Sequence, residues 1–349
     1  MRLLSVLTAL ALGAFAATAA LAIDIQEDFD PLGPTVHKLE LANGKTIAYI
    51  DDGDPQGIPV VFAGGSGTSV RVFGITEFLR TLRGQLGLRV ISVERDGFGE
   101  TAFTPGWGYA DYAAEVEALL DHLGVDRFVA AAISGGGPYL TEVVARLPER
   151  VRSVHLISAY SQFDPDDPSF GPLCALPLPD LNDVAAFFAA NPNIWFAFAP
   201  DSPVQIIPGF QDSAFEDAAR TFFVAGQLGD PAPLTAELRR YCEDPVADVS
   251  ALQAPAFIYQ GTADTSVDPL HAAFWEAHYP NVAKVRIYEG EGHDIQYRHW
   301  DQILVDMAGL SDRTVLCNGA QSLLLPEGTA ERLLAQGATP GICAWQALP

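Results

Sequence analysis

The chain has 349 residues and is strongly acidic, with 20 lysine and arginine residues against 44 aspartate and glutamate residues, for a formal net charge of −24. Such a surface repels nucleic acids and anionic membranes, so the charge excludes both as partners and argues against polyanionic substrates. A chain of this length buries enough surface for one large domain with an insertion, or for two domains.

The first residues are typical of an export signal. Arg2 precedes an uncharged, alanine- and leucine-rich segment that ends in Ala20-Leu21-Ala22. One positive residue, a short apolar core and a small-residue ending predict a secretory signal peptide over residues 1–22. An uncleaved anchor is the alternative, since about 20 residues carry no charge. We therefore expect an exported protein, periplasmic or extracellular, that has no membrane contact after signal cleavage.

Four cysteines in an exported chain indicate disulfide bonds. Cys174, Cys242, Cys317 and Cys343 allow three pairings. We expect the bonds Cys174–Cys242 and Cys317–Cys343, because the first pair then lies within the segment 161–250 and the second within the segment 313–349. Free buried thiols are the alternative.

The elements that follow begin with a hairpin and continue as an alternation of strands and helices. Residues 36–41 and 46–50 alternate between apolar and polar side chains around the turn signal Asn43-Gly44. Six apolar runs then predict strands, at residues 59–62, 88–93, 128–133, 154–157, 256–259 and 285–288. Between the second and third of these runs, apolar residues recur at helical spacing. This order predicts an α/β fold, with a mostly parallel, eight-stranded sheet flanked by helices.

Two segments depart from the alternation. Residues 161–250 are rich in aromatic residues and prolines without a clear strand, and we expect a helical cap insertion over the carboxyl edge of the sheet. The core then comprises residues 23–160 and 251–312, with a last helix at about residues 295–310. Residues 313–349 are expected to form a disulfide-closed tail with one helix, residues 329–336, inside the Cys317–Cys343 bridge.

The sequence Ala132-Ile133-Ser134-Gly135-Gly136 lies between a buried strand run and the start of a helix. It follows the pattern G-x-S-x-G, with alanine in place of the first glycine. Small neighbours permit the sharp, strained turn from strand to helix that exposes a serine hydroxyl. The alternative is an ordinary serine in a glycine-rich loop.

A serine nucleophile needs a base and a group that orients the base. His293 is in a glycine-rich loop directly behind the last strand run, whereas His299 is expected on a helix surface. Asp264 follows the strand at residues 256–259 and is the expected orienting carboxylate. Asp164, beyond the preceding strand, is the alternative.

The oxyanion of an acyl-transfer reaction also needs hydrogen-bond donors. We expect these to be the backbone N–H groups of Gly65, in the glycine-rich loop after residues 59–62, and of Gly135. No Lys-Ser/Thr pair follows the loop, and its glycines do not match G-x-G-x-x-G, so nucleotide binding is not expected.

An oxyanion loop, a serine, an aspartate and a histidine thus follow one another in this order, each behind a strand. The sequence here resembles the α/β-hydrolase family over roughly residues 36–310, and the segments 52–55 and 95–101 agree with it. The resemblance implies Ser134 as nucleophile, His293 as base, Asp264 as its orienting group and residues 161–250 as the family's cap. Two departures stand out: Ala63-Gly64, where capped members often have His-Gly, and Gly135, where a larger residue is usual.

These residues predict a secreted serine hydrolase that cleaves a carboxylic ester, or a related acyl compound such as a lactone, through an acyl-enzyme. The expected partner is a small, apolar acyl substrate, and the chemistry calls for no metal or organic cofactor. One alternative is a proline-releasing aminopeptidase, in which Asp212, Glu216 or Asp217 would hold the substrate amine. Another is a non-catalytic binding protein of the same fold. A dehalogenase is disfavoured, since that reaction generally uses a carboxylate where Ser134 stands.

Overall fold

The computed structural model describes residues 21–22, 33–191, 194, 210–221, 223–224 and 227–343. The predicted signal peptide lies outside the described residues, apart from Leu21 and Ala22. No helix in the described part of the chain has the length and apolar character needed to cross a membrane.

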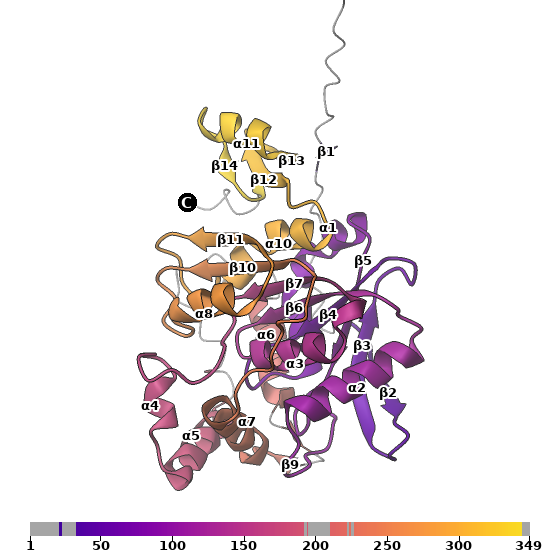
Figure 1. Ribbon diagram of the computed structural model, residues 1–349, viewed down its shortest axis with the longest axis vertical. Helices are drawn as coiled ribbons and strands as arrows, with labels where there is room; N and C mark the ends of the chain where they lie inside the picture. Colours follow the sequence, from indigo (N-terminus) through magenta and orange to yellow (C-terminus); the bar gives the residue numbers. More distant parts are fainter. Residues whose placement is uncertain are drawn as a thin grey trace, which may run out of the picture.

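An eight-stranded sheet forms the centre of the molecule (Figure 1). Its strand order is β11-β10-β7-β6-β4-β5-β3-β2. Only β3 runs antiparallel to the other seven strands, and this arrangement confirms the predicted mostly parallel sheet. The strands are β2 (Val36–Glu40), β3 (Thr46–Asp52), β4 (Ile58–Ala63), β5 (Leu88–Val93), β6 (Phe128–Ile133), β7 (Val151–Ile157), β10 (Ala256–Gly261) and β11 (Val282–Tyr288).

Helices cover both faces of this sheet. One hydrophobic cluster joins one face to α2 (Tyr109–His122), α3 (Gly136–Arg146) and α8 (Leu270–His278). A second cluster joins the other face to the 3-10 helix η1 (Val70–Leu79), α1 (Arg80–Gln85), α9 (Ile295–Arg298) and α10 (Trp300–Met307). Because both faces are covered, β5 and β6 are buried at every position, as the continuous apolar run of β6 predicts. The short 3-10 helix η2 (Pro148–Arg150) leads into β7.

The predicted last helix, at about residues 295–310, is divided in the structure. His299 separates α9 from α10 with a φ of −111° and a ψ of 19°, outside the helical region. Its imidazole stacks on Tyr288 at a centroid distance of 3.7 Å and its Nε2 lies 2.9 Å from Glu291. These contacts with the preceding strand and loop hold the chain out of a continuous helix.

Residues 158–255, between β7 and β10, are called the insertion below. The described part of this segment, within which the cap was predicted at residues 161–250, includes the helices α4 (Gly171–Cys174), α5 (Leu178–Ala190), α6 (Phe210–Thr221) and α7 (Ala232–Glu243). Helices α4, α5 and α7 lie together at the end of the molecule remote from the tail (Figure 1). The sequence showed no clear strand here, but β8 (Phe223–Val224) pairs with β9 (Gln227–Leu228). Two residues per strand are too few to produce a visible alternation.

The tail contains more structure than the single predicted helix. That helix is α11 (Glu327–Leu334), and it packs on the hairpin of β12 (Arg313–Asn318) and β13 (Gln321–Pro326), with β14 (Thr339–Pro340) beside β12. The two-residue strand β1 (Leu21–Ala22) pairs with β13. The predicted cysteine pairs are both at bonding distance, with S–S separations of 2.04 Å for Cys317–Cys343 and 1.97 Å for Cys174–Cys242.

Candidate active site

Ser134 occupies a strained turn between β6 and α3. Its φ of 52° is in the left-handed region that non-glycine residues rarely adopt. The surrounding backbone holds this conformation: the Ser134 N–H donates to Ile157 at 3.1 Å, and its carbonyl accepts from the N–H groups of Tyr160 at 2.9 Å and Gly137 at 3.2 Å. The hydroxyl is thereby presented at the carboxyl edge of the sheet.

The glycines of the turn are required by close packing of the backbone. A Cβ atom at Gly136 would lie 2.4 Å from the carbonyl oxygen of Ala63, at the end of β4. At Gly137 it would lie 2.2 Å from the carbonyl oxygen of Tyr160. The fully buried Ala132, which takes the place of the first glycine in the usual pattern, is accommodated inside β6.

The three residues expected to form a catalytic chain are within hydrogen-bond distance of one another. His293 Nε2 lies 3.2 Å from Ser134 Oγ, and His293 Nδ1 lies 2.8 Å from Asp264 Oδ2. The other carboxylate oxygen of Asp264 accepts from the N–H groups of Ser266 and Val267, each at 2.9 Å. Asp264 thus orients the imidazole with Nδ1–H toward itself, which leaves Nε2 free to accept a proton from the serine.

The charge of Asp264 is stabilised where it lies. Burial raises the pKa of this carboxyl, but the imidazole of His293 and the hydrogen bonds from Ser266 and Val267 lower it more. The resulting pKa is below the usual value, so the carboxylate is ionised at neutral pH and can stabilise a cationic imidazole.

The loop that carries His293 is held close to the end of β10. A Cβ atom at Gly261 would lie 2.3 Å from the carbonyl oxygen of Glu291, so only glycine permits this approach. The Glu291 side chain is 2.9 Å from His299 and 3.5 Å from Arg298. These contacts hold the loop that positions the imidazole of His293.

Both expected oxyanion donors lie next to Ser134. A Cβ atom at Gly65 would be 3.3 Å from the Cβ of Ser134, and Gly135 is the next residue in the chain. Neither N–H donates to an acceptor among the described residues. Both therefore remain available to an oxygen atom bound beside the hydroxyl.

The loop after β4 is held by two charged residues that the sequence did not indicate. Arg95 donates from Nη1 to the carbonyl of Gly64 at 2.8 Å, and from Nη2 to the carbonyl of Gly65. Its Nε lies 3.1 Å from Glu237 of α7, whose other oxygen accepts from the Gly67 N–H at 2.7 Å. Arg95 and Glu237 are 4 % and 0 % exposed. The sequence signals for Arg95 were its position behind a buried strand and its place at the start of the segment 95–101, and neither indicated its contacts with the loop.

A cavity of about 230 Å³ opens beside Ser134 and His293. Most of its large side chains are apolar or aromatic, whereas hydroxyl and amide groups line the rest. The side chains of this wall come from Phe62, Val72, Ile133, Phe170, Tyr297, Ser66, Thr68, Thr76, Ser266 and Gln296. The size and lining suit a small molecule with a short apolar group.

The alternative residues weighed in the sequence lie elsewhere. Asp164 accepts a hydrogen bond from the N–H of Asp166 in a turn of the insertion, so it does not orient His293. None of the acidic residues Asp212, Glu216 and Asp217 lines the cavity at Ser134. Asp217 is buried and hydrogen-bonded to the hydroxyl of Ser69 instead.

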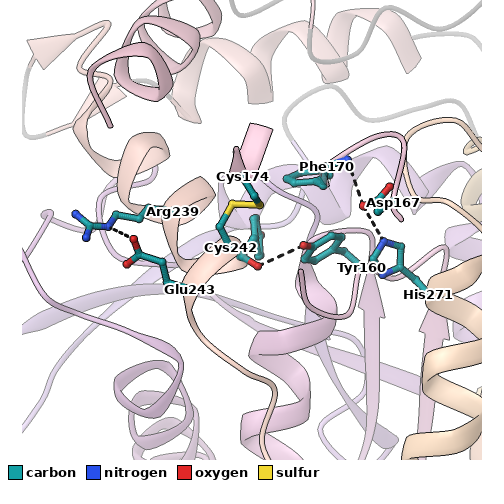
Figure 2. The surroundings of a disulfide bond; sticks show 9 residues. Tyr160, Asp167, Phe170, Cys174, Arg239, Cys242, Glu243 and His271 are labelled. Carbon is teal, nitrogen blue, oxygen red and sulfur yellow. Dashed lines mark hydrogen bonds and ion pairs between the residues drawn. A yellow bond between two sulfur atoms is a disulfide. The ribbon is translucent and has the colours of Figure 1, made fainter. Parts of the chain in front are cut away.

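The structure contains a second hydrogen-bonded set of serine, histidine and aspartate, which the sequence did not predict. His271 Nδ1 lies 2.8 Å from Ser161 Oγ, and its Nε2 lies 3.1 Å from Asp167 Oδ2, beside Tyr160 (Figure 2). Burial lowers the pKa of His271 more than Asp167 raises it. All three residues are buried and none lines the cavity at Ser134, so this set connects the insertion to α8 without access to substrate.

Comparison with known proteins agrees with the observed fold. The sequence profile described as alpha/beta hydrolase fold matches residues 58–299. The chain is 26% identical over 248 residues to the uncharacterized hydrolase YcgS of Bacillus subtilis, covering 68% of this chain and 84% of that one. It is 30% identical over 112 residues to haloalkane dehalogenase 2 of Mycobacterium tuberculosis, covering 32% and 37% of the two chains.

Solved structures show the same fold. One comes from work on carboxylesterases of Nitrososphaera gargenis, with a TM-score of 0.61 and 19% identity over 79% of this chain and 99% of that chain. The matched profile spans the strands from β4 to β11 and the loops that carry Ser134, Asp264 and His293. This chain is therefore a member of the alpha/beta hydrolase fold family.

Proposed function

We propose that the protein is a serine hydrolase that cleaves a carboxylic ester, or a related acyl compound such as a lactone. The observation that carries the proposal is the hydrogen-bonded chain from Ser134 Oγ through His293 to Asp264, at the edge of an apolar cavity. The similarity to haloalkane dehalogenase 2 covers only part of either chain, and a dehalogenase would need a carboxylate where this chain has Ser134.

The first half of the reaction forms an acyl-enzyme. Ser134 Oγ attacks the carbonyl carbon while His293 Nε2 takes the hydroxyl proton, and the negative charge develops on the carbonyl oxygen. The N–H groups of Gly65 and Gly135 stabilise that oxygen. The tetrahedral intermediate then expels the alcohol, which receives its proton from His293.

The second half repeats these steps with water. His293 removes a proton from a water molecule as it attacks the acyl carbon, and then returns the proton to Ser134 Oγ. Asp264 stabilises the cationic imidazole in both halves, which its low pKa allows. Among the described residues of the insertion, no acidic group lines the cavity to hold a substrate amine, and this favours an acyl ester over an aminoacyl substrate.

Replacement of the nucleophile tests the proposal. We expect Ser134→Ala to lower kcat for p-nitrophenyl butyrate at least 10³-fold and to abolish labelling by a fluorophosphonate, with circular dichroism unchanged. Ser161→Ala is the matched control, because it alters the buried set around His271 and should retain labelling. Undiminished turnover in Ser134→Ala, or no labelling of the native protein, would reject the proposed chemistry.

Export is the second part of the proposal. Two disulfide bonds are typical of proteins that fold in an oxidising compartment, and residues 1–22 have the pattern of a signal peptide. Expression of the full chain in a bacterium should give a protein outside the cytoplasm whose first residue, measured by mass spectrometry of the intact chain, is Ile23. A cytoplasmic chain that retains residues 1–22 would contradict this part.

A further inference from the structure

We propose that helix α7 of the insertion positions the oxyanion hole, with Tyr241 holding the turn after Ser134 and Glu237 holding the loop after β4 through Arg95. This inference rests on the proposed function. It assigns to the insertion a positioning role at the reacting atoms, beyond forming a wall of the cavity.

Tyr241 connects the two halves of the oxyanion hole. Its hydroxyl donates to the carbonyl of Gly135 at 2.8 Å and accepts from Ser66 Oγ at 3.1 Å. Gly135 supplies one expected donor, and Ser66 directly follows Gly65, which supplies the other. The Tyr241 side chain is 1 % exposed, and its bond to Gly135 forms away from solvent, where its geometry is well defined. The bond to Ser66, which lines the cavity, is partly buried.

The same tyrosine explains the unusual glycine after the nucleophile. A Cβ atom at Gly135 would lie 2.4 Å from the Tyr241 hydroxyl and 2.0 Å from Ser66 Oγ. A side chain at position 135 would therefore collide with groups from the insertion and from the oxyanion loop. Glycine at position 135 and the Tyr241 hydroxyl therefore depend on each other, because the hydroxyl occupies the place of a Cβ atom.

Arg95 and Glu237 fix the direction of the other donor. The peptide between Gly64 and Gly65 is planar and trans, so its carbonyl and its N–H point in opposite directions. Arg95 binds that carbonyl at 2.8 Å, and the Gly65 N–H consequently points away from Arg95. Glu237 neutralises the buried guanidinium at 3.1 Å and accepts from the Gly67 N–H. Without this carboxylate, the buried guanidinium would lack its counter-charge.

Both anchoring residues lie on one face of α7. Glu237 and Tyr241 are four residues apart, so their side chains project from adjacent turns of the same helix. Cys242, next to Tyr241, is bonded to Cys174 of α4 (Figure 2). The position of α7 is therefore covalently tied, and a shift of this helix would move both supports of the oxyanion hole together.

Removal of the hydroxyl of Tyr241 tests the inference. Outright loss of an oxyanion donor lowers kcat by about 10²–10³-fold. Because Tyr241→Phe only loosens the support, we expect kcat for p-nitrophenyl butyrate to fall about 10-fold, with KM within twofold. The affinity for a trifluoromethyl ketone, which forms a tetrahedral oxyanion with an activated serine, should fall by the same factor.

The matched control is Tyr279→Phe. Tyr279 is equally buried and loses a comparable hydrogen bond to Thr141 at 3.1 Å, but it touches neither half of the oxyanion hole. We expect its kcat and ketone affinity to stay within twofold of the native values. A Tyr241→Phe variant that matches this control, or one that raises KM with kcat unchanged, would overturn the inference.

A second variant gives an independent decision, should Tyr241→Phe fold poorly. Glu237→Gln keeps the size and an acceptor for the Gly67 N–H but removes the charge beside Arg95, and it should also lower kcat and ketone affinity together. Native values of both in a folded Glu237→Gln protein would count against the role of α7. Fluorophosphonate labelling of the native protein separates the two proposals, because it establishes the reactive serine whatever these variants do.

Discussion

Access to the cavity distinguishes two similar groups of side chains in this protein. Ser134 with His293 and Ser161 with His271 have comparable hydrogen-bond distances, yet only the first pair lines the cavity. The imidazole of His293 is 22 % exposed, whereas that of His271 is fully buried. A chain of polar contacts is therefore insufficient to identify a reactive serine, and access to the cavity is the deciding property.

A buried carboxyl near the oxyanion loop makes stability depend on pH. Glu94 is 2 % exposed, and burial raises its pKa from 4.5 to about 7, although the N–H groups of Glu100 and Thr101 bind it. The folded state holds this proton more tightly than the unfolded state. The free energy of unfolding should therefore decrease, by at most about 1.4 kcal/mol per pH unit for this group, as the pH rises from 4.5 to 7.

Glu94→Gln removes that titration. We expect the native protein to lose stability relative to the variant between pH 5 and pH 7, measured as urea unfolding free energies of both proteins. Burial, and to a smaller extent the charge of Glu94, raise the pKa of Asp217 to about 7; burial, the larger cause, is the same in both proteins. A difference between the two proteins that is the same at both pH values would contradict the prediction.

At the level of single residues, the sequence predicted the site residues that belong to a local pattern. Ser134, Asp264 and His293 each follow an apolar run within a loop of small residues, so their places at one sheet edge could be predicted. Arg95, Glu237 and Tyr241 could not be predicted. Their contacts depend on the path of α7 relative to the sheet, and neither spacing nor composition specifies that path.

Among the elements, helix α7 links stability to the geometry of the site. The Cys174–Cys242 bond closes a stretch with a sequence separation of 68 and holds α7 to α4. Replacement of both cysteines by serine should lower the free energy of unfolding by about 2–4 kcal/mol, because the unfolded chain gains conformational freedom. We also expect kcat to fall several-fold, since α7 carries Glu237 and Tyr241.

The tail provides the control for this prediction. Replacement of Cys317 and Cys343 by serine also removes a disulfide, yet that bond joins β12 to the residues after β14. The elements of the tail lie away from α4, α5 and α7 (Figure 1). This variant should lose stability and keep its kcat, as measured by urea unfolding and ester hydrolysis. Equal losses of kcat in both double variants would show that the effect reflects general destabilisation.

The elements that the sequence predicted are those with long apolar runs. All eight strands of the central sheet were expected, although β7 and β11 each begin three residues before the predicted run. The division of the last helix at His299 was missed because it depends on contacts with Tyr288 and Glu291. These two residues lie outside the helix, so the helical spacing of its apolar residues carries no sign of them. For β12 and β13 a signal was present, since Asn318-Gly319 separates two apolar runs as in a tight hairpin.

For the molecule as a whole, the net charge of −24 is a source of self-repulsion. Several of its ion pairs are buried, such as Arg83 with Glu77, and salt screens these less than it screens exposed charges. We therefore expect the melting temperature to rise by a few degrees between 10 mM and 500 mM sodium chloride, measured by circular dichroism. A melting temperature that falls over this range would show that attractive surface pairs outweigh the repulsion.

The covalent tie beside Tyr241 has a consequence for when the protein becomes competent. In a reducing cytosol the sulfur atoms of Cys174 and Cys242 would stay as thiols, and the segment that braces the oxyanion donors would be loosely held. Newly made chains would then hydrolyse esters poorly until they were oxidised. With the proposed export, such latency would protect acyl compounds inside the cell until the chain reaches an oxidising compartment.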